Sequence, residues 1–194
     1  KEPFSAGADL AGVLASLQEG RIDDFRAMIG QFQATSQRIK YAQIPVVAAV
    51  RGMALGGGCE FQMHAARTVF ALESYIGLVE AGVGLLPAGG GLKEIAVRVG
   101  QNPPNGDVFA GLKPYFEAIA MGKVSGSALE AKELKLARDS DVVVFNAYEL
   151  LYVAKAQARA MAESSYRAPI APKAVPVAGS IGIATFKMML VNMQ

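Results

Sequence analysis

The chain has 194 residues, of which 52% are hydrophobic and 19% are charged, a composition typical of a folded domain and not of a disordered chain. A formal net charge of +2 without a Lys/Arg run argues against a nucleic-acid partner. A single Cys and a single His supply neither a disulfide nor a conventional zinc site.

The apolar run at residues 44–50 is far shorter than the roughly 20 residues that span a bilayer. We therefore expect no membrane partner, and the lone Cys favours a reducing, cytoplasmic location.

The first 42 residues predict a loop followed by a helix. Residues 1–12 lack apolar periodicity and contain two glycines, which is typical of a loop. Residues 23–42 place apolar side chains three to four positions apart, which predicts an amphipathic helix with Asp23 or Asp24 as its N-cap.

A strand, a helix and a second strand are predicted next. Residues 46–50 are uniformly apolar, which fits a strand buried on both faces. Three glycines at residues 56–58 then form a tight turn into a helix at residues 59–66, and residues 68–72 form the next buried strand. This order predicts a parallel βαβ unit in an α/β fold.

The C-terminal half is expected to be mainly helical. A helix is expected at 92–99 and a loop or insertion at 100–114. A capping box at Ser127 begins a helix that runs to residue 137, and a strand follows at 141–145. A second capping box at Asn146 begins a helix that runs to residue 163, and the Pro-rich tail from 168 is expected to be extended before a short helix at 185–192. We predict two regions, a catalytic core at 1–124 and a helical region with a Pro-rich tail at 125–194.

The glycine turn at residues 56–58 has two interpretations. The first N–H groups of the following helix lack partners, so they can stabilise an oxygen that gains negative charge. The glycines equally permit plain close packing of the helix on a sheet. No Gly-Lys-Ser/Thr follows the turn, and Pro87 replaces the third glycine of a dinucleotide fingerprint, which excludes both common phosphate-binding loops.

Two acidic residues flank the predicted second strand. Glu60 lies in the first turn of the helix, and Glu80 follows the strand in an apolar stretch. In a parallel βαβ unit the chain returns to the edge that it left, which predicts that the two carboxylates lie together and divide acid and base roles. The alternatives are that Glu60 only complements the helix dipole and that Glu80 faces water.

Other candidates fit structural roles better. His64 shares a helix face with Glu60, but no Gly-x-Ser-x-Gly nucleophile motif accompanies it. Cys59 is expected in the core. Lys93 and Arg98 could meet the phosphates of a ligand, although a solvated helix face is the favoured role.

Four segments resemble the enoyl-CoA hydratase/isomerase (crotonase) family. They read FSAGADL at 4–10, IPVVAAVRGMALGGGCEF at 44–61, VEAGVGLLPAGGG at 79–91 and SGSALEAKEL at 125–134. The resemblance implies a crotonase-like ββα spiral core that is incomplete at its N-terminus and is followed by C-terminal helices. Residues 100–123 and the tail are closer to hydratase domains of bifunctional 3-hydroxyacyl-CoA dehydrogenase proteins.

The resemblance also implies a site. The N–H groups of Ala6 and Gly57 match the two oxyanion-hole donors for an acyl-CoA thioester, and Glu60 and Glu80 match the paired catalytic glutamates. The further residues expected to contact substrate are Ser5, Gly7, Asp9, Gly56 and Ala88. No metal or cofactor is implied, because CoA is part of the substrate.

The function implied by the resemblance is hydration of 2-enoyl-CoA to 3-hydroxyacyl-CoA in fatty-acid β-oxidation. One alternative is isomerisation of 3-enoyl-CoA to 2-enoyl-CoA. The other is an inactive acyl-CoA-binding fragment of a larger protein. We expect either a homo-oligomer or fusion to a dehydrogenase domain.

Overall fold

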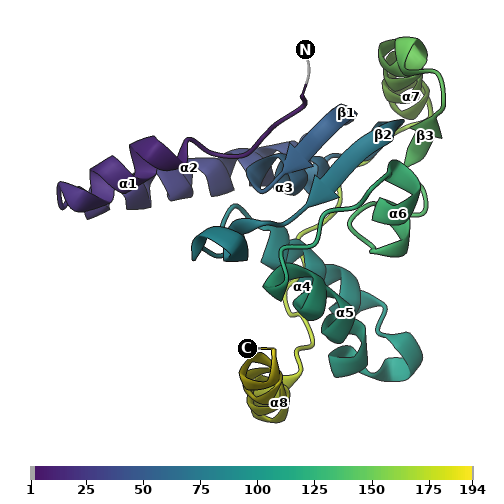
Figure 1. Cartoon of the computed structure of the whole chain (residues 1–194). Coiled ribbons are helices and arrows are strands. Elements are labelled where there is room, and N and C mark those ends of the chain that lie inside the picture. The colour runs from purple at the N-terminus through teal and green to yellow at the C-terminus, as the bar shows by residue number, and fades with distance from the viewer. Residues whose placement is uncertain (1–2, 194) are drawn as a thin grey trace.

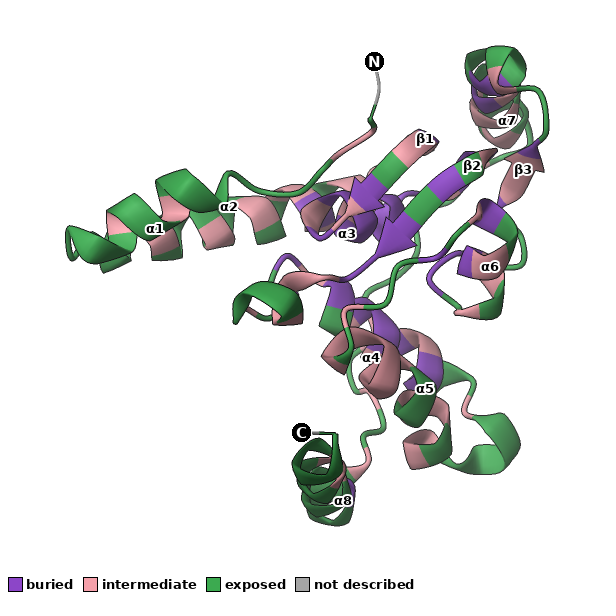
Figure 2. Ribbon diagram, viewed as in Figure 1, coloured by how far each residue is buried: buried purple, intermediate pink, exposed green. Residues whose placement is uncertain are grey.

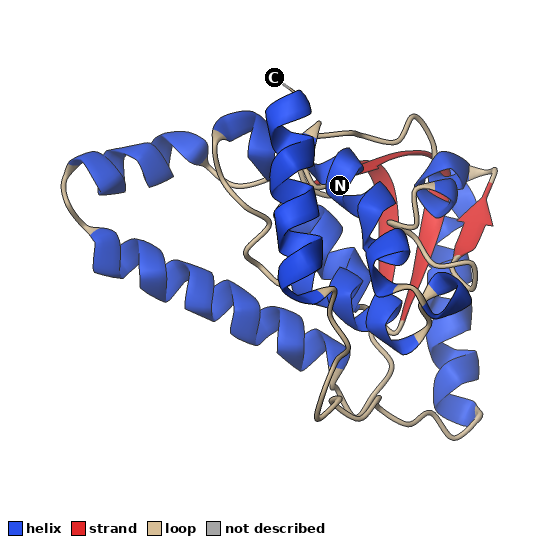
Figure 3. Ribbon diagram, turned by 90° about the horizontal axis from the view of Figure 1, so that it is seen from below, coloured by secondary structure: helices blue, strands red, loops and turns tan. Residues whose placement is uncertain are grey.

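The computed structural model describes residues 3–193 and contains a small parallel sheet with helices around it (Figures 1 and 3). The strands are β1 (Val47–Leu55), β2 (Arg67–Gly77) and β3 (Val142–Val144), which lie in the order β1-β2-β3. Helix α3 (Gly57–His64) connects β1 to β2. The pairings of β1 with β2 and of β2 with β3 are parallel, so the predicted βαβ unit and the α/β class are confirmed.

Both long strands extend beyond their predicted ends. The pairing of β1 with β2 runs from Val47 opposite Arg67 to Leu55 opposite Gly77, with a register shift near Gly52. Gly52 has a φ of 67°, which glycine adopts without strain. The polar and glycine residues after position 50 favour a turn, but the shift allows the ladder to continue through them. Burial on both faces is only partly met in the predicted run, because Val50 is buried whereas residues 46–49 are partly exposed.

Helices α1 (Leu10–Gln18) and α2 (Ile22–Lys40) form an arm that extends from the sheet (Figure 1). The predicted loop at residues 1–12 is wrong from Leu10 onward, because Asp9 caps α1 by accepting a hydrogen bond from the Gly12 amide at 3.2 Å. The prediction that an aspartate caps α2 is also wrong, since Arg21 is the N-cap. The two aspartates lie in the first turn of α2, where they complement the helix dipole.

Within residues 3–193, five further α-helices follow β2. They are α4 (Gly91–Gln101), α5 (Val108–Ala120), α6 (Ala128–Glu133), α7 (Leu150–Glu163) and α8 (Gly179–Asn192). The capping box at Ser127 is confirmed, because its side chain accepts from the Glu130 amide at 3.1 Å. Helix α6 ends earlier than predicted and α8 begins earlier.

The predicted loop at residues 100–114 is wrong in its second half. Asp107 caps α5 by accepting from the Ala110 amide at 3.1 Å, and Pro114 lies inside the helix. Four apolar residues spaced by three and four positions pack α5 against the core: Val108, Leu112, Tyr115 and Ile119. This packing outweighs the hydrogen bond that proline removes.

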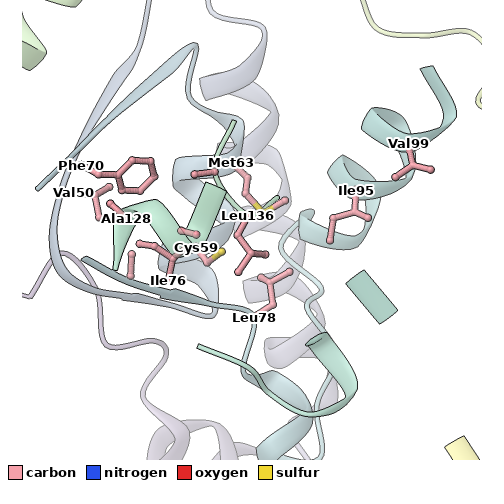
Figure 4. Packing of buried hydrophobic residues seen from close by; sticks show 13 residues of the cluster. Val50, Cys59, Met63, Phe70, Ile76, Leu78, Ile95, Val99, Ala128 and Leu136 are labelled. Atoms are coloured by element: carbon pink, nitrogen blue, oxygen red, sulfur yellow. The ribbon is translucent and has the colours of Figure 1, made fainter. Parts of the chain in front are cut away.

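The main core lies between the sheet and helices α3, α4 and α6 (Figure 4). Cys59 and Met63 of α3 pack among strand residues such as Val50 and Phe70, so the predicted core position of Cys59 is confirmed. Helices α1 and α8, by contrast, are mostly exposed (Figure 2). The core therefore fixes the carboxyl ends of β1 and β2 and the start of α3.

The division into 1–124 and 125–194 stays a prediction. Strand β3 extends the sheet begun by β1 and β2, and Phe186 of α8 stacks on Phe116 of α5 with ring centroids 4.4 Å apart. Within residues 3–193, no helix combines the length and the apolar character needed to cross a bilayer.

Candidate active site

A cavity of about 440 Å³ opens at the carboxyl ends of β1 and β2. Its walls come from α1, α2, the start of α3 and the glycine-rich segment after β2. The lining residues are Ala8, Leu10, Val13, Phe25, Met28, Ile29, Phe32, Gly57, Glu60, Glu80, Gly84, Leu85, Leu86, Ala88 and Gly89. Two carboxylates thus face an otherwise apolar space.

Glu60 is buried in the first turn of α3 and is held by backbone amides. Its Oε1 accepts from the Gly91 N–H at 2.8 Å and its Oε2 accepts from the Gly89 N–H at 3.1 Å. These amides belong to the N-terminus of α4, where Gly90 is the N-cap. Burial raises the pKa of Glu60 above its ordinary value, and the amides of Gly91, Gly89 and Gly90 oppose that rise by favouring the ionised form.

Glu80 has a different environment. It begins a 3-10 turn (Glu80–Val83) just after β2, and its Oε2 is buried without a hydrogen-bond partner in residues 3–193. Burial raises the pKa of Glu80 to about 7, its own amide opposes the rise, and the charge of Glu60 adds to it. Near neutral pH, Glu80 therefore holds a proton in a substantial fraction of molecules.

The two carboxylates come together for the reason expected from the βαβ unit. Leu55 pairs with Gly77 at the end of the ladder, and the Gly56 amide donates to the Gly77 carbonyl at 2.9 Å. A Cβ atom on Gly56 would lie 3.2 Å from the Glu80 Oε1. The close approach of Glu80 to this turn explains why glycine is needed there, in addition to its φ of 52°.

The N-terminal loop lies against the same turn. Ser5 pairs with β1, because its amide donates to the Met53 carbonyl at 2.9 Å and its carbonyl accepts from the Leu55 amide at 3.0 Å. In residues 3–193, the amides of Ala6 and Gly57 donate to no protein group. Both amides therefore lack a protein acceptor, which is a requirement for the predicted oxyanion donors.

Of the remaining residues that were predicted to contact substrate, some line the cavity and others lie outside it. Ala88 lines the cavity, and its carbonyl accepts from Gln33 Nε2 at 2.7 Å. Ser5, Ala6, Gly7, Asp9 and Gly56 lie outside the lining. The Ser5 Oγ accepts from the Gly7 amide at 3.3 Å, and the Asp9 side chain is occupied as the cap of α1.

Sequence reasoning did not identify the apolar wall of the cavity. Phe25, Met28, Ile29 and Phe32 belong to the apolar face of α2, whose periodicity predicts a helix but does not indicate what that face contacts. Phe32 stacks on Phe61 with ring centroids 4.4 Å apart. The apolar stripe of that helix therefore faces the cavity.

The solvated role favoured for Lys93 and Arg98 is wrong for Arg98. Its side chain is mostly buried and donates to the Met63 carbonyl at 2.8 Å. Lys93 lies 2.6 Å from the buried carboxylate of Glu94. Among residues 3–193, no group of three or more His, Cys, Asp or Glu side chains is arranged to hold a metal ion.

Replacing Gly89 with Ala is expected to disturb Glu60 directly. The added Cβ would lie 2.2 Å from Phe32 Cε1 and 2.3 Å from Glu60 Oε2, so both side chains must move. We expect the free energy of unfolding to fall by about 1–3 kcal/mol, as for other overpacked sites, as measured by urea denaturation. Gly82→Ala is the control, because no atom lies within 4 Å of its added Cβ. Equal stability of both variants would contradict this prediction.

Comparisons with known proteins find sequences similar to this chain. A family model described as enoyl-CoA hydratase/isomerase matches residues 1–125. A probable 3-hydroxyacyl-CoA dehydrogenase of Bacillus subtilis strain 168 is 44% identical over 184 residues, which cover 93% of this chain and 23% of the relative. A putative fatty acid oxidation complex trifunctional enzyme of Rickettsia felis is 40% identical over 95 residues, which cover 49% of this chain and 13% of the relative.

Solved structures show the same fold. An enoyl-CoA hydratase from Bacillus anthracis superposes with a TM-score of 0.57 at 27% identity, covering 72% of this chain and 48% of that chain. The present chain therefore spans about half of that solved chain and less than a quarter of the two curated relatives.

Proposed function

The chain belongs to the enoyl-CoA hydratase/isomerase family, and from that premise we propose that it adds water to a 2-enoyl-CoA thioester, giving a 3-hydroxyacyl-CoA. The observation that carries the proposal is the unequal pair of carboxylates in one apolar cavity. Glu60 is held by two amides that favour its ionised form, whereas Glu80 has a pKa of about 7 and an unpartnered oxygen. One base and one acid are the groups that hydration requires.

In the proposed reaction, a water molecule lies between the two carboxylates. Glu60 accepts a proton from this water as the water oxygen bonds to Cβ of the enoyl group. The electron pair of the double bond moves toward the thioester, whose oxygen gains enolate character. Glu80 then donates its proton to Cα. The proton on Glu60 later returns to Glu80 through solvent, so the enzyme is unchanged.

The thioester oxygen would be held by the amides of Ala6 and Gly57. Each lacks a protein acceptor among residues 3–193, and Gly57 lies at the N-terminus of α3, where the helix dipole favours negative charge. Donors held in place before the reaction stabilise an enolate without reorganisation. The apolar wall formed by α1 and α2 would hold the acyl chain.

We expect the protein to remove the conjugated enoyl-thioester absorbance of crotonyl-CoA. The rate should fall as the pH rises through about 7, because Glu80 then loses the proton that it donates. The measurement is kcat/KM from pH 5 to 9. A rate that keeps rising above pH 8 would contradict the role of Glu80 as the acid. No loss of absorbance at any pH would contradict hydration itself.

Isomerisation of 3-enoyl-CoA is the second candidate, because a single carboxyl group such as Glu80 can carry a proton between two carbons. Incubation with a 3-enoyl-CoA separates the two reactions. A hydratase leaves this substrate unchanged, whereas an isomerase forms the conjugated 2-enoyl thioester. Binding of a non-hydrolysable acyl-CoA without either reaction would favour the inactive, CoA-binding alternative.

We further propose that this chain acts beside a dehydrogenase in a longer polypeptide. The Bacillus subtilis relative is named a probable 3-hydroxyacyl-CoA dehydrogenase and is about four times as long as the matched region. The proposed product of hydration, a 3-hydroxyacyl-CoA, is the substrate in that name. Formation of a homo-oligomer stays a prediction.

A further inference from the structure

Charged residues gather around the buried Glu94 carboxylate, where α2, α3 and α4 meet. Glu94 is fully buried, with its Oε2 at 2.5 Å from Lys40 Nζ and its Oε1 at 2.6 Å from Lys93 Nζ. Arg98 Nε lies 4.0 Å from Glu94, and His64 Nε2 lies 3.7 Å from Glu94 Oε1. We call these five residues the Glu94 cluster. None of them lines the cavity, and the proposed reaction uses none of them.

The hydrogen bonds of His64 select one tautomer of its imidazole ring. Nδ1 lies 2.7 Å from the Glu60 carbonyl oxygen, which can only accept, so Nδ1 carries a proton. Nε2 lies 3.3 Å from Lys93 Nζ and accepts from the ammonium group if it is unprotonated. Burial lowers the pKa of His64, and this outweighs the opposing effects of the Glu60 carbonyl and Glu94. A neutral ring with its proton on Nδ1 therefore satisfies both hydrogen-bond partners of the ring, the Glu60 carbonyl and Lys93.

His64 touches both parts of the structure that hold the Glu60 carboxylate. One contact is the Glu60 backbone itself, through Nδ1. The other is Gly90, where an added Cβ would lie 2.8 Å from His64 Cε1 and 2.9 Å from Nε2. Gly90 stands between Gly89 and Gly91, whose amides bind the carboxylate. His64 therefore contacts both the backbone of Glu60 in α3 and the glycine at the N-terminus of α4.

We propose that His64 is a positioning residue for hydration, which sets the distance between α3 and α4 so that the amides of Gly89 and Gly91 both reach Glu60. The Glu60 carbonyl, which accepts from Nδ1, and Lys93, which donates to Nε2, hold the ring in the required tautomer. This inference rests on the proposed function, in which Glu60 is the base. It predicts that changes at His64 alter the ionisation of Glu60 and the rate of the chemical step more than the binding of substrate.

His64→Phe tests the proposal by keeping a flat ring and removing both nitrogens. The Glu60 amide bonds should weaken, so the pKa of Glu60 should rise and the acidic limb of the pH–rate profile should move to higher pH. We expect kcat to fall on the order of 10²-fold, as for a small misplacement of a catalytic group, with KM nearly unchanged. His64→Asn retains a donor near Nδ1 and should restore most of the rate, whereas His64→Gln should not.

The other charged groups near this site are the same in every variant. The charges of Lys40 on α2 and of Lys93 and Glu94 on α4 act on His64. Arg98 lies beside Glu94, and Glu80 lines the same cavity as Glu60. A difference between the pH profiles of variants therefore reports the change at His64.

Gln62→Met is the matched control. Gln62 is as deeply buried as His64 and lies on the same helix, but its side chain donates to the Leu136 carbonyl at 3.1 Å. This variant should lose stability and keep both limbs of the pH profile. An equal shift of the acidic limb in Gln62→Met and His64→Phe would show a general packing effect and overturn the proposal.

A second readout does not depend on turnover. The pKa of Glu60 can be followed by NMR of ¹³C-labelled glutamate side chains in the full chain, and it should be higher in His64→Phe than in the wild type. An unchanged pKa of Glu60 would overturn the positioning role of His64. Failure of the wild type to hydrate crotonyl-CoA would contradict only the proposed function, and the pKa measurement would still test His64. If His64→Phe does not fold, the pKa of Glu60 is measured in His64→Asn and His64→Gln by the same NMR titration, and it should be higher in His64→Gln. Equal pKa values in these two would also overturn it.

Discussion

Glu80→Gln is expected to lower kcat for hydration of crotonyl-CoA by about 10²–10⁴-fold, the usual contribution of a general acid. Protonated glutamate and glutamine are both neutral and have nearly the same shape, so the variant should bind substrate with a similar KM. The fall in rate above about pH 7, which reflects the raised pKa of Glu80, should disappear. Steady-state kinetics from pH 5 to 9 measure all three effects.

Glu73→Gln is the control for this prediction, because Glu73 lies exposed on β2 and the chemical change is the same. It should leave kcat and KM unchanged. Glu60→Gln should lower kcat by a similar factor, and it should also lose stability, since an amide group cannot accept from both Gly89 and Gly91. Normal turnover by Glu80→Gln would mean that another group supplies the proton.

Glu94→Gln should destabilise the fold more than the other Glu→Gln substitutions do. The carboxylate is fully buried and pairs with Lys40 and Lys93, so removing its charge leaves two ammonium groups with a neutral neighbour. Loss of one partner from a buried ion pair costs about 3–5 kcal/mol, and we expect the lower end because Lys93 reaches solvent. Urea denaturation at pH 7 measures the change in the free energy of unfolding.

The stability difference should shrink in acid. Burial raises the pKa of Glu94, but the hydrogen bonds and charges of Lys40 and Lys93 outweigh this and hold it below the ordinary 4.5. The stabilisation by the ionised carboxylate is therefore complete above about pH 4.5 and is lost as the pH falls through the lower folded-state value. Glu163→Gln is the control. It breaks an exposed pair with Arg159 on α7 and should change stability by at most about 0.5 kcal/mol.

The sequence was sufficient to predict the centre of the fold and the pair of acids. The uniform apolar run before the glycines and the return of the next strand made Glu60 and Glu80 neighbours by topology alone. The capping box at Ser127 was also readable, because its signal lies within four residues. These features depend on local chemistry or on rules of chain connection.

The missed features depend on long-range packing. Helix α5 was obscured by Pro114 and the preceding turn residues, although its apolar periodicity was present. The Glu94 cluster joins Lys40 to residues more than 50 positions away, and nothing local distinguishes Glu94 from a solvated helix carboxylate. The unequal environments of Glu60 and Glu80 likewise required the positions of the Gly89 and Gly91 amides.

The two sides of the cavity differ in how well they are packed. Glu60 is anchored to the packed core, whereas α1 has no buried residue and α2 has only Ser36, although both helices contribute apolar side chains to the wall. Segments with so few buried contacts tolerate substitution well. If the proposed function holds, we expect substitutions in the arm, at residues such as Phe25 and Met28, to change selectivity for the acyl group while the reaction at the carboxylates is retained.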